Sequence, residues 1–323
     1  MKTITRRHLI VRHGVMAAAA MIGLRPGHAA DFPSRPVRVI VPQAPGGAAD
    51  QMIRVIAERL ESIWSQTVLI EYKPGGGSVL ATQSVARSAP DGYTIGTAGS
   101  SLTLNSVLRK NLPYTMKDVQ PLARIGYYTT VLLAHPSLPA NNVAEVVALA
   151  KTTPQLYGSN GVGSAAHLAG ELLNKMAGIE MQHVPYNGAS KLYTDMVGGR
   201  LPLGFAIASS ADAFVKSGQL KVIGVTSAVR SPLYPAWPAI AETLPGYEAV
   251  NWAGIYGPAG LPHSVSDQIS ADIVKALRHP DTRKALMTMG VDLAEQPGEE
   301  FAAFLSRDIE RIVPVSKQIG TLD

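Results

Sequence analysis

Two glycine-rich stretches of the chain could bind an anion. QAPGGAAD (43–50) and SNGVGSAAHLAGE (159–171) each follow a run of β-forming residues and lead into a helical pattern. Glycine allows positive φ and a close approach of a ligand to the backbone. The first turn of a helix presents N–H groups without intrahelical partners, and its dipole favours negative charge. We therefore predict two anion-binding turns, although a tight turn without a ligand is an alternative for each.

Polar side chains beside these turns add candidates. Asp50 stands just inside the first helical pattern and could meet a ligand hydroxyl or amine, or only complement the helix dipole. His167 and Glu171 are four residues apart, which favours a local pair on one helix face. A metal site would need a third ligand, and no spacing in the sequence offers one. Tyr186 could bring its phenol into a cleft or pack at an interface.

The motifs of common catalytic sites are missing. The sequence contains no G-x-S-x-G elbow, no H-E-x-x-H and no P-loop. GVGSAA (161–166) fits the dinucleotide fingerprint, but the acid expected after the following strand is missing. Ser100, Ser101 and Ser164 lie in candidate loops, where we expect hydrogen-bond donors rather than nucleophiles. We predict a binding protein that is not an enzyme and uses no cofactor and no metal.

The segments around these residues alternate between strand and helix patterns. Strands are predicted at 36–41, 68–71, 93–97, 131–134, 156–159, 181–185, 201–207, 221–226 and 251–256. Helices are predicted at 50–64, 79–87, 102–108, 143–151, 165–176, 264–277, 281–289 and 299–313. This rhythm predicts an α/β fold with largely parallel sheets. Segment 231–249 is rich in proline and aromatic residues and predicts a long surface connection.

The order of these segments predicts two lobes. Residues 31–128 would combine with 250–323 in the first lobe, and 129–249 would form the second. A chain that crosses twice between lobes makes a two-strand hinge, which is typical of proteins that close around a ligand. In open α/β sheets the ligand crevice lies beyond the carboxyl ends of the strands. We therefore expect the two glycine turns to face each other across one cleft.

The first thirty residues have the pattern of an export signal. A basic start is followed by the apolar run 15–24 and by small residues at Ala29 and Ala30, near which we expect cleavage. The apolar run is shorter than the roughly 20 residues that span a bilayer. Arg6 and Arg7 fit a twin-arginine signal, while an ordinary Sec signal remains open. A cytoplasmic N-terminal helix is the weaker alternative.

The charge balance argues against nucleic-acid binding. The chain has 29 basic and 24 acidic residues, and the predicted signal carries five of the basic ones: Lys2, Arg6, Arg7, Arg12 and Arg25. The remaining chain has 29 − 5 = 24 basic residues and a formal net charge of zero. A neutral chain does not favour nucleic acid or an anionic membrane as a partner. The chain has no cysteine, which excludes disulfides and thiolate chemistry.

Several motifs in one order make the chain similar to a known family. They are PGGAAD (45–50), EYKPGGGSVL (71–80), APDGYTIGTAGSS (89–101), HLAGELL (167–173), HVPYNGASKLYTDMVGGRL (183–201), SGQLKVIGVTSAVRSPLYP (217–235) and LPGYEA (244–249). The chain resembles the periplasmic substrate-binding proteins of tripartite tricarboxylate transporters, the Bug family. The resemblance implies a two-lobed, type II-like Venus-flytrap fold. It also implies capture of a small carboxylate in the periplasm and delivery to membrane permease subunits.

The family resemblance also implies ligand positions. Backbone N–H groups and ordered waters from both glycine turns would hold a ligand carboxylate. The implied and candidate contacts in this sequence are Ala44, Gly46, Gly47, Asp50, Ser100, Ser101, Gly163, Ser164, Ala165, His167, Tyr186 and Ala206.

Two positions depart from the family pattern. The family often has Phe-Asp-Asn where this chain has FAIASSADAF (205–214), so Ala206 or a neighbour replaces an acid, and Tyr72 replaces an asparagine. Without an acid to pair with an ammonium group, we predict a di- or tricarboxylate or an aromatic acid rather than an α-amino acid. We expect a monomer. The alternatives are an exported enzyme acting on a carboxylate or ester, and a sensor that presents its ligand to a membrane kinase.

Overall fold

The protein is described from a computed structural model, which describes residues 32–43, 45–46, 48–186 and 189–319. The chain divides into two compact units, Met1–Ser34 and Arg35–Asp323. The sheets and helices named below belong to the second unit. The predicted signal (1–30) and the candidate residues Ala44 and Gly47 lie outside the described residues.

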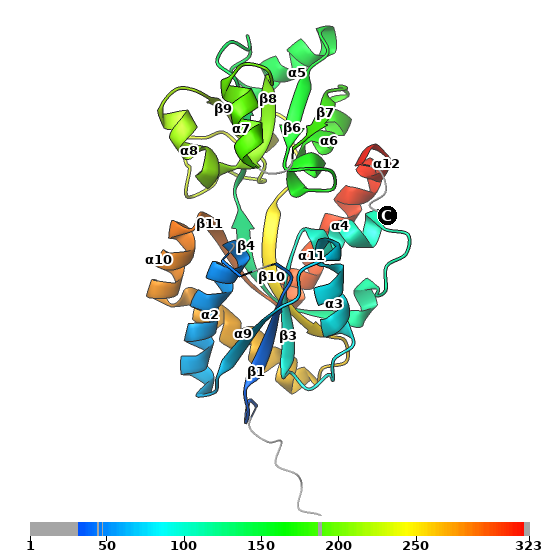
Figure 1. The fold of residues 1–323 in the computed structure, drawn as a ribbon, viewed down its shortest axis with the longest axis vertical. Helices are drawn as coiled ribbons and strands as arrows, with labels where there is room; N and C mark the ends of the chain where they lie inside the picture. Colours follow the sequence, from blue (N-terminus) through cyan, green and yellow to red (C-terminus); the bar gives the residue numbers. More distant parts are fainter. Residues whose placement is uncertain (1–31, 44, 47, 187–188, 320–323) are drawn as a thin grey trace, which may run out of the picture. The chain divides into compact units, whose positions relative to one another are not determined.

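Six strands form the first sheet, in the order β11-β4-β10-β3-β1-β2 (Figure 1). These strands are β1 (Val37–Val41), β2 (Val68–Tyr72), β3 (Thr94–Gly99), β4 (Val119–Tyr128), β10 (Asn251–Pro258) and β11 (Val291–Pro297). The α-helices that accompany them are α2 (Ala48–Trp64), α3 (Val79–Ala86), α4 (Ser101–Leu108), α9 (His263–Arg278), α10 (Pro280–Thr288), α11 (Gly298–Ile312) and α12 (Ser316–Ile319). Short 3₁₀ turns are η2 (Gly76–Ser78), η3 (Met116–Asp118) and η5 (Val313–Val315).

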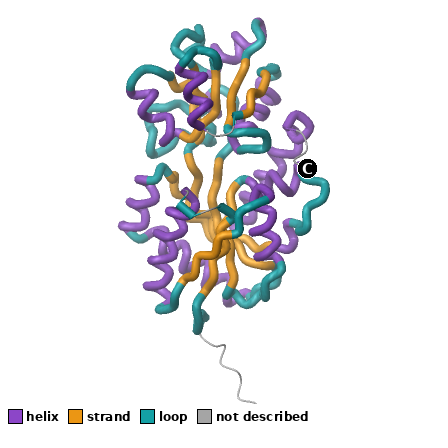
Figure 2. Tube along the Cα trace, in the orientation of Figure 1, coloured by secondary structure: helices purple, strands orange, loops and turns teal. Residues whose placement is uncertain are grey.

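Five strands form the second sheet, in the order β7-β6-β8-β5-β9. They are β5 (Thr130–Ala134), β6 (Leu156–Ser159), β7 (Gln182–Pro185), β8 (Leu203–Ile207) and β9 (Lys221–Val225). Its helices are α5 (Val143–Thr152), α6 (Ala165–Ala177), α7 (Ala189–Val197) and α8 (Ala208–Lys216), with the 3₁₀ turn η4 (Ile240–Glu242). In Figure 2 the strands of each sheet are flanked by helices, as expected of an α/β fold.

Apolar patterning explains the first elements. Four of the five residues of β1 are buried, as befits a strand between β2 and β3. In α2, Ile53, Ile56 and Leu60 recur at helical spacing and are fully buried. This apolar face packs mainly toward α9 and α10 in the same half of the chain. The predicted strand and helix boundaries here differ from the observed ones by one or two residues.

The prediction of largely parallel sheets is wrong. β1 pairs parallel with β2 and β3, but β10 is antiparallel to both β3 and β4, and β11 is antiparallel to β4. In the second sheet β6 is parallel to its neighbours and β5 is antiparallel to both of its own. The cause is the crossing: β4 leads into β5 through Thr129, and the chain returns through β10 beside β4. An outgoing and a returning strand must pair antiparallel.

Segment 231–249 is a largely irregular connection, as its composition predicts, but parts of it are buried. Ile240 and Tyr247 are both fully buried in it. The Tyr247 hydroxyl donates to the Ala169 carbonyl of α6 at 2.8 Å. A buried phenol needs such a partner, so this contact secures the connection against the helix.

One apolar cluster joins helices that accompany different sheets. Leu104 and Leu108 of α4 belong to it, together with Ile312 and Val315 near the C-terminus. The residues of α6 in the cluster are Ala166, Leu168, Ala169, Leu172 and Leu173. Helices α4 and α6 therefore share one core.

Candidate functional site

A cavity of about 290 Å³ lies where loops of the two sheets meet. Residues before β5 and after β9 contribute Gln43, Gly77, Ser78, Gly99, Ser100, Ser101, Leu104 and Asn251. Residues between them contribute Thr130, Asn160, Gly163, Ser164, Ala165, Ala166, Ala206 and Ile207. Larger hollows lie near α9, of about 470 and 800 Å³. The smaller cavity is the candidate site because strand ends and helix N-termini converge on it.

The cavity wall carries polar groups but no charged side chain among its described residues. Hydroxyl groups come from Ser78, Ser100, Ser101, Thr130 and Ser164, and amide groups from Gln43, Asn160 and Asn251. A neutral wall cannot attract an anion by a formal charge. Attraction would have to come from helix dipoles and backbone N–H groups.

The N-terminus of α6 supplies such groups. Ser164 is the N-cap, with φ −78° and ψ 160°, and its Oγ accepts from the His167 N–H at 3.1 Å. The first regular helical bond runs from Leu168 N–H to the Ser164 carbonyl at 3.0 Å. Within the described part of the chain, no hydrogen bond uses the N–H of Ala165 or Ala166. Both residues line the cavity, so these two donors are open to a ligand.

The N-terminus of α4 lies at the same cavity. Ser100 precedes this eight-residue helix, and its Oγ donates to the Val250 carbonyl at 3.0 Å. Thr103 donates to the Asp308 carboxylate of α11 at 2.6 Å, and Trp252 Nε1 donates to the same oxygen at 2.9 Å. Helix α4 is therefore tied to α11 and β10. Two helix N-termini, one accompanying each sheet, face one neutral polar space.

Six of the twelve candidate residues line this cavity: Ser100, Ser101, Gly163, Ser164, Ala165 and Ala206. Gly46, Asp50, His167 and Tyr186 are described but are not part of its wall. From the first glycine turn, the described residue that reaches the cavity is Gln43.

Asp50 holds the first glycine turn rather than facing the cavity. Its Oδ2 accepts from the Gly46 N–H at 2.7 Å. Its Oδ1 accepts from the Tyr72 hydroxyl at 2.6 Å and pairs with Arg54 Nε at 2.8 Å. The Tyr72 hydrogen bond, followed by that of Gly46, lowers the pKa of Asp50. Tyr72 therefore orients the acid that ties this turn to its helix.

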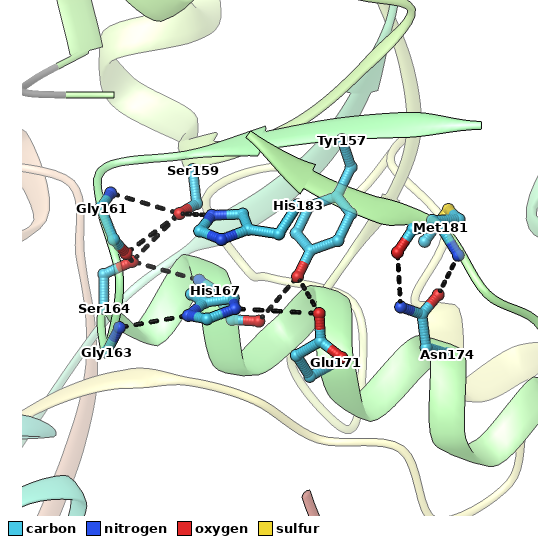
Figure 3. A network of polar contacts seen from close by, with 10 residues as sticks. All are labelled: Tyr157, Ser159, Gly161, Gly163, Ser164, His167, Glu171, Asn174, Met181 and His183. Atoms are coloured by element: carbon cyan, nitrogen blue, oxygen red, sulfur yellow. Dashed lines mark hydrogen bonds and ion pairs between the residues drawn. The ribbon is translucent and has the colours of Figure 1, made fainter. Parts of the chain in front are cut away.

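His167 and Tyr186 also have partners of their own and do not line the cavity. The buried His167 ring accepts from the Gly163 N–H through Nδ1 at 3.1 Å (Figure 3). Its Nε2 lies 3.8 Å from Glu171 Oε1, too far for a hydrogen bond. The Tyr186 hydroxyl donates to Asp195 of α7 at 2.9 Å, and its N–H donates to the Ser159 carbonyl.

Sequence reasoning missed ten of the lining residues: Gln43, Gly77, Ser78, Gly99, Leu104, Thr130, Asn160, Ala166, Ile207 and Asn251. Gln43 and Asn160 carried a usable signal, because each is an amide beside a glycine turn. Thr130 and Asn251 carried none, because they reach the site only through the crossing of the chain.

Among the described residues, no three His, Cys, Asp or Glu side chains are grouped so that they could hold a metal ion. Within those residues there is also no helix whose length and apolar character would suffice to cross a membrane.

The chain is similar to a known receptor family. The family model "tripartite tricarboxylate transporter family receptor" (TctC) matches residues 52–321. A UPF0065 protein in the tcbD–tcbE intergenic region of Pseudomonas sp. (strain P51) is 31% identical over 313 residues. The alignment covers 95% of this chain and 93% of that protein.

Two solved structures with bound acids are similar to most of the chain. A protein from R. palustris with adipate has a TM-score of 0.72 and 28% identity, covering 90% of this chain and 98% of that one. MatC from Rhodopseudomonas palustris with bound malate has a TM-score of 0.69 and 26% identity, with 88% and 100% covered. These matches confirm the predicted class, an α/β fold with two lobes.

Proposed function

Because the chain belongs to the tripartite tricarboxylate transporter receptor family, we propose that it is a periplasmic solute-binding protein that captures a small carboxylate. The ligand is bound reversibly, is not transformed, and is delivered to the membrane permease subunits of a tripartite transporter. In this proposal, residues 31–128 and 250–323 form one lobe and residues 129–249 form the other. The protein is exported and binds its ligand as a monomer.

The observation that carries the proposal is the pairing of two helix N-termini across a neutral cavity. The unpaired N–H groups of Ala165 and Ala166 come from α6, and Ser100 and Ser101 stand at the start of α4. A charge-assisted hydrogen bond contributes roughly 1.5–3 kcal/mol. Three or four of them would support micromolar binding, about −8 kcal/mol, after ordering costs.

The size of the cavity favours a small ligand. About 290 Å³ lies at the lower end of the roughly 300–1,000 Å³ of common ligand pockets. Two similar proteins hold dicarboxylates, adipate and malate. Ala206 adds no acid to the wall, so a ligand ammonium group would find no partner there. We propose a di- or tricarboxylate or an aromatic acid as the ligand.

The first test is calorimetry of the purified protein with malate, adipate, citrate, benzoate and aspartate. We expect saturable one-to-one binding of at least one of the first four, with the ligand recovered unchanged. Turnover of a bound acid would support the enzyme alternative instead. Tight one-to-one binding of aspartate would contradict the assigned ligand class.

A proline at position 165 tests the backbone donors directly. Ser164 has φ −78° and ψ 160°, which suits a residue before proline, and proline is favoured at the first helical position. Ala165→Pro therefore removes one cavity N–H while leaving the helix start intact. We expect the Kd for the bound acid to rise about tenfold or more, since one charge-assisted hydrogen bond is lost.

His263→Pro is the matched control. It also changes the first residue of a helix, α9, after a residue with ψ 137°, and the His263 side chain is exposed. The Kd should stay unchanged in this variant. Equal Kd values for Ala165→Pro and the wild type, measured by the same calorimetry, would remove the α6 N-terminus from the site.

A further inference from the structure

Two stacked histidines lie behind the second glycine turn. The rings of His167 on α6 and His183 on β7 have centroids 3.7 Å apart and planes at 13° (Figure 3). His167 is 3% exposed, and neither ring is among the residues that line the cavity. If His167 influences a ligand, it must therefore do so through another group.

A hydrogen bond to the backbone links His167 to the cavity wall. The Gly163 N–H donates to His167 Nδ1 at 3.1 Å. Gly163 lines the cavity and has φ +72°, a conformation that favours glycine. It directly precedes Ser164, the cap that starts α6 and sets the direction of the Ala165 and Ala166 N–H groups. The Gly163 N–H is therefore engaged by a side chain and not aimed at a ligand.

The bond defines the protonation state of the ring. An acceptor at Nδ1 requires a neutral imidazole with its proton on Nε2. Burial, and to a lesser extent the neighbouring His183, lowers the pKa of His167 to about 4. The neutral form is thus the one present at ordinary pH.

The groups that surround His167 are consistent with a neutral ring. Glu171, on the same helix, accepts from the Tyr157 hydroxyl of β6 at 2.6 Å. His183 lies 2.7 Å, through Nε2, from Ser159 Oγ at the end of β6. Tyr247, from the connection after β9, donates to the α6 backbone and not to the ring.

We propose that His167 is a positioning residue for ligand binding, whose Nδ1 holds Gly163 so that the Ala165 and Ala166 N–H groups point into the cavity. It does not touch the ligand. This inference rests on the proposed function. It assigns His167 an indirect effect on ligand binding, through Gly163.

Two substitutions separate the acceptor from the packing. His167→Leu keeps apolar volume but removes the acceptor, whereas His167→Asn keeps an acceptor oxygen close to the Nδ1 position. We expect the Kd for the best acid in the panel to rise roughly tenfold in His167→Leu, the loss of about one hydrogen bond. In His167→Asn the Kd should stay within about threefold of the wild type, because the acceptor is retained.

Asn174→Leu provides the matched control. Asn174 lies near the other end of α6, where its Nδ2 donates to the Met181 carbonyl and its Oδ1 accepts from the Met181 N–H, both at 3.0 Å (Figure 3). Removing these bonds should lower the melting temperature. It should leave the Kd unchanged, since Asn174 does not touch the glycine turn.

A second readout needs no ligand. Amide hydrogen exchange measured by NMR should be faster at Gly163 in His167→Leu than in the wild type and close to wild type in His167→Asn. Unchanged exchange in the Leu variant, or equal Kd values in the Leu and Asn variants, would overturn the inference. If the wild type binds no acid of the panel, the proposed function fails, while Gly163 exchange still decides whether His167 positions the turn.

Discussion

Ala206 places a small apolar side chain in the wall of the candidate cavity. It lies on β8, is 1% exposed and lines the cavity. An acid there would face an anionic ligand. With a small apolar side chain at this position the cavity wall stays neutral, and the helix N-termini stabilise the negative charge of the ligand.

We therefore expect Ala206→Asp to weaken binding of the preferred acid at least tenfold, because two like charges would share one small site. Ala206→Asn introduces a side chain of nearly the same size as Asp but without the charge. It is the control for the loss of cavity volume. Calorimetry of both variants gives the answer. If the Asn variant binds as poorly as the Asp variant, bulk and not charge excludes side chains at this position.

Asp50 shows that a residue in the right motif can have a different role. Sequence reasoning left open whether this acid meets a ligand or complements the helix dipole. Its three partners, Gly46, Tyr72 and Arg54, account for both of its oxygens. Gly46 and Arg54 are each four residues from Asp50. Tyr72 comes from strand β2, so its hydrogen bond to Asp50 could not be predicted without the sheet.

At the scale of elements, α4 depends on a buried acid for its position. Asp308 of α11 is 4% exposed, and its Oδ2 accepts from Thr103 and from Trp252. Burial raises the pKa of this carboxyl. Losing the acceptor would leave the buried Trp252 Nε1 without a partner, while the Thr103 hydroxyl could still donate to the Ser100 carbonyl at 3.1 Å.

We expect Asp308→Ala to lower the free energy of unfolding by about 1–3 kcal/mol, since the unpaired buried donor of Trp252 is costly. Asp308→Asn keeps an oxygen for both donors and should have a smaller effect. Urea titration measures the stabilities. A loss of stability that is equal in both variants would mean that the charge of Asp308, and not its acceptor role, holds α4.

Elements with strong local signals were predicted well, and the family assignment was confirmed. Strand β4 was missed because Pro121 and Gly126 argue against a central strand, and register shifts against β10 break its alternation. Strand β11 was missed because its register against β4 shifts between Leu293 and Gln296, and it ends in proline.

The glycine turns of the site were predictable because their signal is local. Thr130 and Asn251 join the site only through strand pairing.

At the scale of the whole second unit, the crossing of the chain is secured by buried groups. Thr129, between β4 and β5, and Ser231, in the connection after β9, both donate to the Asp292 carboxylate of β11. The apolar cluster that joins α4 to α6 adds a second link. A destabilising substitution in α6 should therefore lower the free energy of global unfolding, and not only that of local opening.

The two stacked imidazoles should make stability depend on pH in a defined window. Burial lowers the pKa of both His167 and His183 from 6.5 to about 4. As pH falls below 6.5, the unfolded chain binds protons before the folded one, so the free energy of unfolding falls until about pH 4. Each ring contributes up to about 3 kcal/mol to the free energy of unfolding.

Urea titrations at pH 7, 6 and 5 isolate this effect, because most carboxylates titrate at lower pH. His167→Asn removes one ring and should roughly halve the slope, whereas a wild-type stability that is flat from pH 7 to 5 would contradict a neutral buried pair.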